Sequence, residues 1–182
     1  SLPAVSVCFV DIVQFTDIAA TLAPKVLLHE LNTLFTAFDR IVEQNQCERM
    51  KTIGDAYLCV CGIPEENPRH AQCIASAALE MMAYLTKRNK RAKQRWQVRI
   101  GIHSGPLVGG IVGTRKYLYD IFGDTVNIAA RLEKLSQPMH INLSQATCDL
   151  LGDEFIFSCA RQVEMKGKGE QITCFLEGRR GQ

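Results

Sequence analysis

The sequence lacks any long hydrophobic run. No apolar stretch approaches the roughly 20 residues that a membrane-spanning helix requires, and no signal peptide is visible. Internal repeats, low-complexity tracts and obvious linkers are missing too, so we expect residues 1–182 to form a single cytoplasmic domain. The chain opens at Ser1-Leu2-Pro3 without a methionine. We therefore expect it to be part of a longer protein, which a segment outside this chain could anchor in a membrane.

Patterns of cysteine and histidine that bind metals are also lacking. The eight cysteines show no paired spacing typical of a zinc site, and the four histidines are dispersed along the chain. Cys59 and Cys61 are separated by one residue in a strand-like run, which points both thiols to one face. We interpret the cysteines as buried free thiols of a protein in a reducing compartment.

Charge of one sign is concentrated in a single short segment. The chain is 47% hydrophobic and 22% charged, with a formal net charge of +2, which is ordinary for a globular domain. Residues 87–95 hold six positive charges at the end of a predicted helix, where cations offset the helix dipole. A nucleic-acid or lipid surface is an alternative, but we interpret this segment as a solvated loop and expect no nucleic-acid partner.

Apolar residues alternate between strand-like and helix-like spacing along the chain. Val5, Val7 and Phe9 fall on one face of a first strand, and Cys8 and Val10 fall on the other. The remaining predicted elements are a helix at 24–45, a hairpin at 47–63 with its turn at residues 54–55, a helix at 68–89, strands at 96–103 and 107–112, a hairpin arm, a helix from about 124, a strand at 140–143 and a C-terminal strand pair. This order predicts an α+β fold in which helices cover a mostly antiparallel sheet.

Two aspartates lie at the ends of strand-like runs. Asp11 closes the apolar run 7–10, and Asp55 lies in the predicted hairpin turn. If the hairpin lies beside the first strand, the two carboxylates meet at one edge of the sheet. A carboxylate at the rim of a buried strand costs free energy unless a positive charge pairs with it. The two sites together therefore predict a shared divalent cation and metal-assisted phosphoryl chemistry.

A third segment, 119–133, predicts a polar helix face. Asp124 or Thr125 can cap a helix on which Asn127 and Arg131, at i and i+4, project from the same side. An amide and a guanidinium presented together suit a sugar and a phosphate.

Each of these side chains also has a simpler interpretation. Asp11 can cap the helical segment that follows it, and Asp55 can be an ordinary turn residue. Arg131 can be a solvated helix charge that pairs with Glu133 or Lys134.

Five segments in order resemble the catalytic domain of class III nucleotidyl cyclases. The matching segments are 9–16 and 51–55, which resemble the family's metal motifs, 99–106, which resembles the strand before its dimerisation arm, 119–133, which resembles its base and transition-state segment, and 163–169, which resembles its phosphate-binding stretch. The resemblance spans about residues 4–177. It implies a ferredoxin-like core, shared with polymerase palm domains, for the predicted α+β sheet.

The resemblance implies an adenylyl cyclase that converts ATP to 3′,5′-cyclic AMP and pyrophosphate by a two-metal in-line mechanism. Asp11, Asp55 and the backbone carbonyl of Ile12 would hold two Mg²⁺ or Mn²⁺ ions per active site. Arg131 would stabilise charge on the α-phosphoryl oxygens, and Asn127 would position the ribose. The remaining phosphate contacts would come from Lys166 and the backbone N–H groups of Val13, Gln14, Phe15 and Thr16.

Base selection is assigned by the resemblance to Lys51 and Asp120. Adenylyl cyclases place a lysine and an aspartate at these positions, and guanylyl cyclases typically place a glutamate and a cysteine or serine. Adenine presents an N1 acceptor and an N6 donor, whereas guanine inverts both. A lysine donor and an aspartate acceptor therefore favour ATP, because polar groups left unpaired discriminate strongly.

The family builds each active site from two subunits, the metal aspartates from one and the base, ribose and phosphate residues from the other. This chain has both sets, so the resemblance implies a head-to-tail homodimer with two interfacial sites and regulatory domains elsewhere in the parent chain. The alternatives are a guanylyl or dual-specificity cyclase, and a catalytically silent module that senses a nucleotide or transmits a signal.

Overall fold

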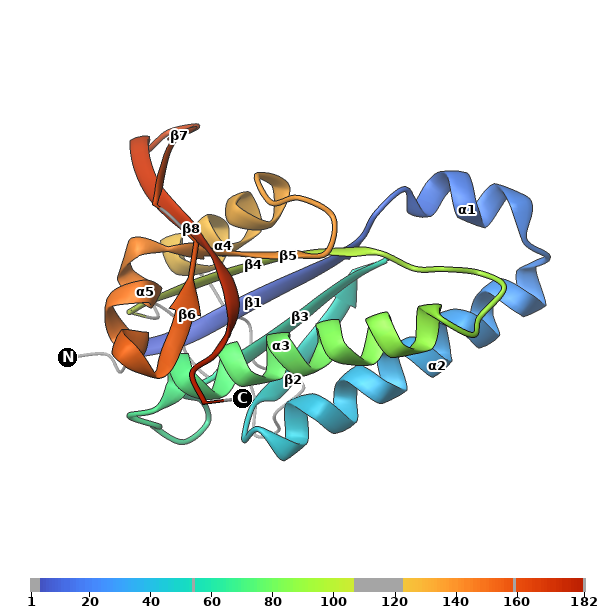
Figure 1. Cartoon of the computed structure of the whole chain (residues 1–182), viewed down its shortest axis with the longest axis horizontal. Helices are drawn as coiled ribbons and strands as arrows, with labels where there is room; N and C mark the ends of the chain where they lie inside the picture. The colour runs from blue at the N-terminus through green and yellow to red at the C-terminus, as the bar shows by residue number, and fades with distance from the viewer. Residues whose placement is uncertain (1–3, 54, 107–122, 159, 182) are drawn as a thin grey trace.

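The computed structural model describes residues 4–53, 55–106, 123–158 and 160–181 (Figure 1). In chain order its elements are β1 (Ala4–Ile12), α1 (Phe15–Thr21), α2 (Pro24–Gln44), β2 (Glu48–Ile53), β3 (Ala56–Cys61), α3 (His70–Asn89), β4 (Val98–Pro106), α4 (Asp124–Lys134), β5 (His140–Ser144), α5 (Gln145–Leu151), the 3₁₀ turn η2 (Gly152–Glu154), β6 (Phe155–Phe157), β7 (Arg161–Met165) and β8 (Gly169–Arg179).

The strands of the described residues form one sheet in the order β2-β3-β1-β4-β5-β8-β6, with β7 paired to β8. The first four strands are antiparallel neighbours, and only β4 and β5 run parallel. The order β2-β3-β1-β4, with helices joining β1 to β2 and β3 to β4, is the ferredoxin-like arrangement. The predicted α+β fold with a mostly antiparallel sheet is confirmed.

Helices cover both faces of this sheet (Figure 1). The main core lies between the sheet and α2 and α3, where Cys8 and Val10 of β1 meet buried side chains such as Phe38 and Met81. A smaller cluster on the opposite face joins Val5, Val7 and Phe9 of the same strand to Ala129 of α4 and to β3. The two-faced pattern predicted for the first strand is therefore what the packing shows. Strands buried on both faces need such continuous apolar runs.

The predicted elements agree with the structure within a few residues, with two exceptions. The helix α4 begins after Gly123, which occupies the N-cap position at φ 114°, so the prediction that Asp124 or Thr125 caps it is wrong. Glycine accepts this positive φ without the steric cost that a Cβ would add. The short elements α5 and β6 were not predicted. The predicted strand 107–112 and the hairpin arm predicted after it lie outside the described residues.

The cysteines are only partly as predicted. Cys8, Cys47, Cys59 and Cys61 are buried free thiols, and Cys73 is a half-buried one. Cys148 and Cys174 form a disulfide between α5 and β8, so the expectation of free thiols is wrong for this pair. The two residues are distant in sequence and become neighbours only because α5 packs beside β8.

Close contact between β4 and α4 fixes the position of the helix. A Cβ atom added at Gly101 of β4 would lie 2.1 Å from the amide nitrogen of Glu133 and 2.7 Å from the carbonyl oxygen of Ala129. The helix end is also tied to β5, because Asn142 Nδ2 donates a hydrogen bond to the Leu132 carbonyl at 2.9 Å. Only glycine allows the backbones of helix and strand to approach this closely.

We predict that Gly101→Ala displaces α4 and lowers the free energy of unfolding by roughly 3 kcal/mol or more, the upper range for overpacked cores. Urea unfolding followed by circular dichroism measures this change. Gly178→Ala on β8 is the matched control, because an added Cβ there meets no atom within 4 Å. Equal unfolding midpoints for the two variants would contradict the described contact.

Candidate active site

Asp11 and Asp55 meet at one end of the sheet. Asp11 on β1 stands opposite Ala56 of β3, and Asp55 directly precedes Ala56 in the turn between β2 and β3. The two side chains lie close enough for Asp55 to raise the pKa of Asp11. Asp11 lies within β1 and the N-cap of α1 is Gln14, so the capping alternative for Asp11 does not apply. The structure thus brings together the two carboxylates that the sequence predicted to be neighbours.

The environment of Asp11 carries an excess of negative charge. Burial, followed by the proximity and charge of Asp55, raises the pKa of Asp11 to about 6, while Arg99 acts in the opposite direction. A carboxyl group with such a pKa is held where its ionised form lacks sufficient positive charge. A cation placed between the two carboxylates would remove this deficit.

An arginine and a buried glutamate support the pair from behind. Arg99 of β4, opposite Asp11 in the strand register, places its Nη2 3.6 Å from Asp11 Oδ2 and its Nε 3.3 Å from Glu133 Oε2. Glu133 of α4 is only 5% exposed, and its burial, followed by the charge of Asp11, raises its pKa to about 7. Glu133 therefore pairs with Arg99, and the alternative in which it neutralises Arg131 finds no support here.

Sequence reasoning did not assign a role to Arg99 or Glu133. The sequence places Arg99 in a strand motif and offers Glu133 only as a surface partner for Arg131. The available signal was the antiparallel pairing of the two strands, which sets a cation in the second strand beside Asp11. The contribution of Glu133 depends on the packing of α4 on β4, which no local pattern reveals.

The donor set fits a hard divalent cation. Carboxylate and carbonyl oxygens are the ligands that Mg²⁺ and Mn²⁺ prefer, and Ile12, which follows Asp11 in β1, has a backbone carbonyl in the same strand end. The described residues contain no group of three or more His, Cys, Asp or Glu side chains placed to hold a metal ion. Two carboxylates and a carbonyl would thus leave coordination positions for water and substrate phosphates, as is usual for Mg²⁺.

A second group of predicted residues gathers at α4 and the β7–β8 turn. A Cβ atom at Gly167 would lie 3.7 Å from Arg131 Nη1, so the guanidinium lies against the turn that follows Lys166. Lys168 of the same turn forms an ion pair with Asp124 in the first turn of α4. Asn127 is exposed on the helix face between them. Asn127, Arg131 and the exposed Lys166, which precedes Gly167, are therefore presented in one region.

The two groups lie on different sides of α4. Glu133 faces Arg99 and Asp11, whereas Arg131, two residues earlier, contacts the β7–β8 turn. Residues at i and i+2 of a helix project in nearly opposite directions. No hydrogen bond or ion pair of the described residues joins Arg131, Asn127 or Lys166 to the two aspartates. Within one chain, Arg131 is turned away from the carboxylate pair.

The remaining predicted site residues are only partly described. The Val13 N–H donates to the Gln97 carbonyl at 2.8 Å, so this amide is already engaged. Gln14 follows in the left-handed conformation, φ 55°, and α1 begins at Phe15 and continues through Thr16. Lys51 belongs to β2, but its side chain lies outside the described part, as does the whole of Asp120.

The basic segment 87–95 is not uniformly solvated. Arg88 forms an ion pair with Glu30 of α2. Lys90 and Arg95 line a hollow of about 560 Å³ together with residues 13 and 14. Part of this segment therefore lies beside the loop after β1.

Comparisons with known proteins agree on one family. Residues 1–178 match the family described as the Adenylate and Guanylate cyclase catalytic domain. The chain is 37% identical over 175 residues to an adenylate cyclase of Mycobacterium tuberculosis, covering 96% of this chain and 40% of that protein. It is 39% identical over 182 residues to a receptor-type guanylate cyclase of Caenorhabditis elegans, covering 98% of this chain and 14% of that protein.

A solved structure shows the same architecture. The catalytic core of a rhodopsin-guanylyl cyclase with converted specificity, in complex with ATPαS, superposes with a TM-score of 0.88 at 34% identity, covering 98% of each chain. The chain thus belongs to the adenylate and guanylate cyclase catalytic-domain family, the class III nucleotidyl cyclases, as the sequence motifs predicted. It spans less than half the length of the curated relatives named above. Among the described residues, none of the helices is both long enough and apolar enough to cross a membrane.

We predict that the metal-free protein loses stability as the pH rises from about 5 to 8. A carboxyl group whose pKa is raised in the folded state stabilises that state when protonated, and this stabilisation disappears as the pH passes its folded pKa. Those values are about 6 for Asp11 and about 7 for Glu133. We expect a decrease of roughly 1 to 3 kcal/mol in the free energy of unfolding.

Urea unfolding with a chelator present, at pH 5 and at pH 8, measures this difference. Asp11→Asn should flatten the profile, because it removes one titrating group and the charge that raises the pKa of Glu133. The matched control is Asp153→Asn, which changes an exposed carboxyl in η2. Identical pH profiles for the wild-type protein and Asp11→Asn would contradict the assignment.

Proposed function

We propose that this chain is an adenylyl cyclase domain that converts ATP to 3′,5′-cyclic AMP and pyrophosphate at a site shared by two copies. The observation that carries the proposal is the meeting of Asp11 and Asp55, in a member of the cyclase family, at the edge of the sheet. Two neighbouring carboxylates repel each other when both are ionised. Divalent cations that bind the substrate triphosphate would relieve this repulsion.

One group of residues binds the metal ions. Asp11, Asp55 and the Ile12 carbonyl would hold two divalent ions, Mg²⁺ or Mn²⁺, which would supply acidity for the ribose 3′-hydroxyl and positive charge for the triphosphate. Arg99 and Glu133 keep Asp11 in place, through the contacts at 3.6 Å and 3.3 Å.

The second group of residues acts on the nucleotide. Arg131 neutralises charge that develops on the α-phosphoryl oxygens, and Asn127 orients the ribose for in-line attack by its 3′-oxygen. Lys166 pairs with the outer phosphates, aided by free backbone N–H groups of residues 14–16. These roles rest on the family resemblance and on the proximity of Arg131 to the turn that follows Lys166.

The choice of ATP rests on Lys51 and Asp120. A lysine donor and an aspartate acceptor complement the N1 and N6 edge of adenine and leave guanine with two like-polarity contacts. GTP is the second candidate substrate, because the chain is about as similar to a guanylate cyclase as to an adenylate cyclase. The related core bound to ATPαS is a guanylyl cyclase with converted specificity, so base choice can change within this fold.

The two sides of α4 support the proposal of a head-to-tail homodimer. Arg131 is turned away from the aspartates of its own chain, while both sets of residues are present in every copy. Two copies related by a twofold axis can each supply Asp11 and Asp55 to one site and Arg131 to the other. We also propose that the parent protein carries regulatory domains beyond this chain, which spans 40% of the mycobacterial relative, and that this domain works in the cytoplasm.

We predict that the purified chain forms cyclic AMP from ATP with Mg²⁺ or Mn²⁺, and much less cyclic GMP from GTP. Asp55→Asn should lower turnover by more than about a hundredfold without unfolding the protein, because one of the two carboxylate ligands is lost. The control Asp153→Asn should retain full activity. Chromatographic assay of both cyclic products measures these rates.

Replacing Lys51 by Glu together with Asp120 by Cys should shift the preference toward GTP by at least about tenfold. Cyclic GMP as the main product of the unaltered chain would overturn the choice of ATP. A folded chain that forms neither product would favour the catalytically silent module.

A further inference from the structure

Three free thiols meet at the end of the sheet opposite to Asp55. Cys47 directly precedes β2, Cys61 ends β3, and Cys73 lies in the first turn of α3. The three side chains lie near enough to shift one another's pKa values. The Cys47 thiol donates a hydrogen bond to the Asn45 carbonyl at 3.4 Å, and the Cys61 thiol donates one to the Gln46 carbonyl at 3.5 Å. Asp55 precedes the first residue of β3 and Cys61 is the last, so the full length of this strand separates the thiols from the aspartates.

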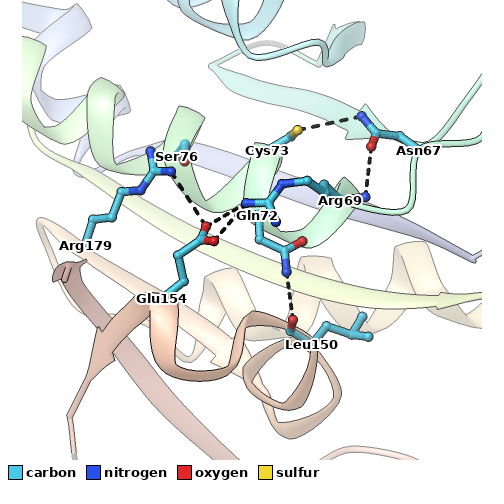
Figure 2. Close-up of polar contacts among 8 residues, drawn as sticks. All are labelled: Asn67, Arg69, Gln72, Cys73, Ser76, Leu150, Glu154 and Arg179. Atoms are coloured by element: carbon cyan, nitrogen blue, oxygen red, sulfur yellow. Dashed lines mark hydrogen bonds and ion pairs between the residues drawn. The ribbon is translucent and has the colours of Figure 1, made fainter. Parts of the chain in front are cut away.

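An amide group is fixed against two of these sulfur atoms. Asn67 Nδ2 lies 3.7 Å from the sulfur of Cys61. It also lies 3.7 Å from the sulfur of Cys73, as Figure 2 shows. The side chain of Asn67 is held in this position because its Oδ1 accepts a hydrogen bond from the Arg69 backbone N–H at 2.9 Å. Such donors favour a thiolate over a thiol. The neighbouring side chains of Cys47, and then of Cys73 and Asn67, lower the pKa of Cys61 although burial opposes the change. Burial raises the pKa of Cys73, so its role in this site rests on its access to solvent.

Cys73 gives this cluster an opening to solvent. It is half-buried, and it lines a hollow of about 220 Å³ together with Arg69, Gln72, Ser76 and Arg179 (Figure 2). Arg69 and Arg179 converge on Glu154, with contacts of 2.8 Å and 3.7 Å, which keeps the wall of the hollow in place. A hollow of this size is large enough to admit a small peroxide.

Metal binding does not account for the cluster. The part of the chain that the structure describes has no three-residue group of His, Cys, Asp or Glu side chains suited to hold an ion. The thiols are instead arranged as a pair with one accessible member and one hydrogen-bonded partner. That arrangement is typical of cysteines that undergo reversible oxidation.

We propose that Cys61 and Cys73 form a redox-modification site at which hydrogen peroxide or a similarly small peroxide produces a Cys61–Cys73 disulfide. The Cys73 sulfur attacks one peroxide oxygen, the O–O bond breaks, and the thiol proton joins the leaving hydroxide as water. The Cys61 sulfur then attacks the sulfenic acid formed on Cys73, the S–S bond forms, and the S–O bond breaks to release a second water. Two thiols are oxidised and one peroxide is reduced.

The chain contains a matched internal control for the role of access. Cys8 of β1 and Cys59 of β3 stand directly opposite each other in the strand register. Both are at most 1% exposed. This pair has the proximity of the proposed site without its opening, so it should stay reduced under the same treatment.

The experiment treats the intact chain with hydrogen peroxide, blocks remaining thiols with an alkylating reagent and maps the products by mass spectrometry. The expected result is a cross-linked peptide pair joining Cys61 to Cys73, reversed by dithiothreitol, while Cys8 and Cys59 remain alkylated. A link from Cys61 to Cys47, a link between Cys8 and Cys59 formed as fast, or an unchanged Cys73 would overturn the proposal.

Variants test the assigned roles separately. Asn67→Ala should slow formation of the link at least several-fold, because the donor to both sulfur atoms is lost. Asn45→Ala is the matched control, since Asn45 lines the same hollow but donates to Ile41 and Glu80 instead. Cys73→Ser should remove the link and leave Cys61 as a thiol. Equal rates for Asn67→Ala and Asn45→Ala would contradict the role of Asn67. If a variant fails to fold, the disulfide mapping of the unaltered chain alone tests the proposal.

Discussion

The close approach of two carboxylates, Asp11 and Asp55, is the constraint on which the rest of this structure depends. Their meeting is set by the register of β1 against β3, in which Asp11 stands opposite Ala56 and thus beside the turn that contains Asp55. A slip of one residue would turn Asp11 to the other face of the sheet. The sheet therefore has to hold its register firmly, and the apolar clusters on both faces of β1 provide that restraint.

The helix α4 contacts Arg99 of β4 on one side and the β7–β8 turn on the other. Gly101 lets it lie directly on β4, which brings the buried Glu133 to Arg99 behind Asp11. The opposite side of the same helix presents Arg131 beside the β7–β8 turn and Asn127 to solvent. A single rigid element thus supports the carboxylate pair of its own chain and offers an arginine outward. This geometry supports the proposed dimer, in which Arg131 of one copy acts at the carboxylate pair of another.

Local patterns were sufficient for the elements that depend on them. The apolar spacing of 24–45 and 68–89 predicted the long helices, and the Gly54-Asp55 turn signal between two strand-like runs predicted the hairpin that brings Asp55 beside β1. What the sequence could not reveal depends on distant contacts. The Arg99–Glu133 pair, the Cys148–Cys174 disulfide and the cluster of Cys47, Cys61 and Cys73 each join segments that become neighbours only through the sheet order and helix packing.

The central claim is that the carboxylates of one copy work with Arg131 of another, and complementation tests it most directly. Asp55→Ala and Arg131→Ala chains, each inactive alone, are mixed in equal amounts and allowed to exchange subunits. Half of the dimers are then mixed, and each has one intact site of two, so the account predicts recovery of about a quarter of wild-type activity. A mixture as inactive as its components, with mixed dimers demonstrated by native mass spectrometry, would contradict the account.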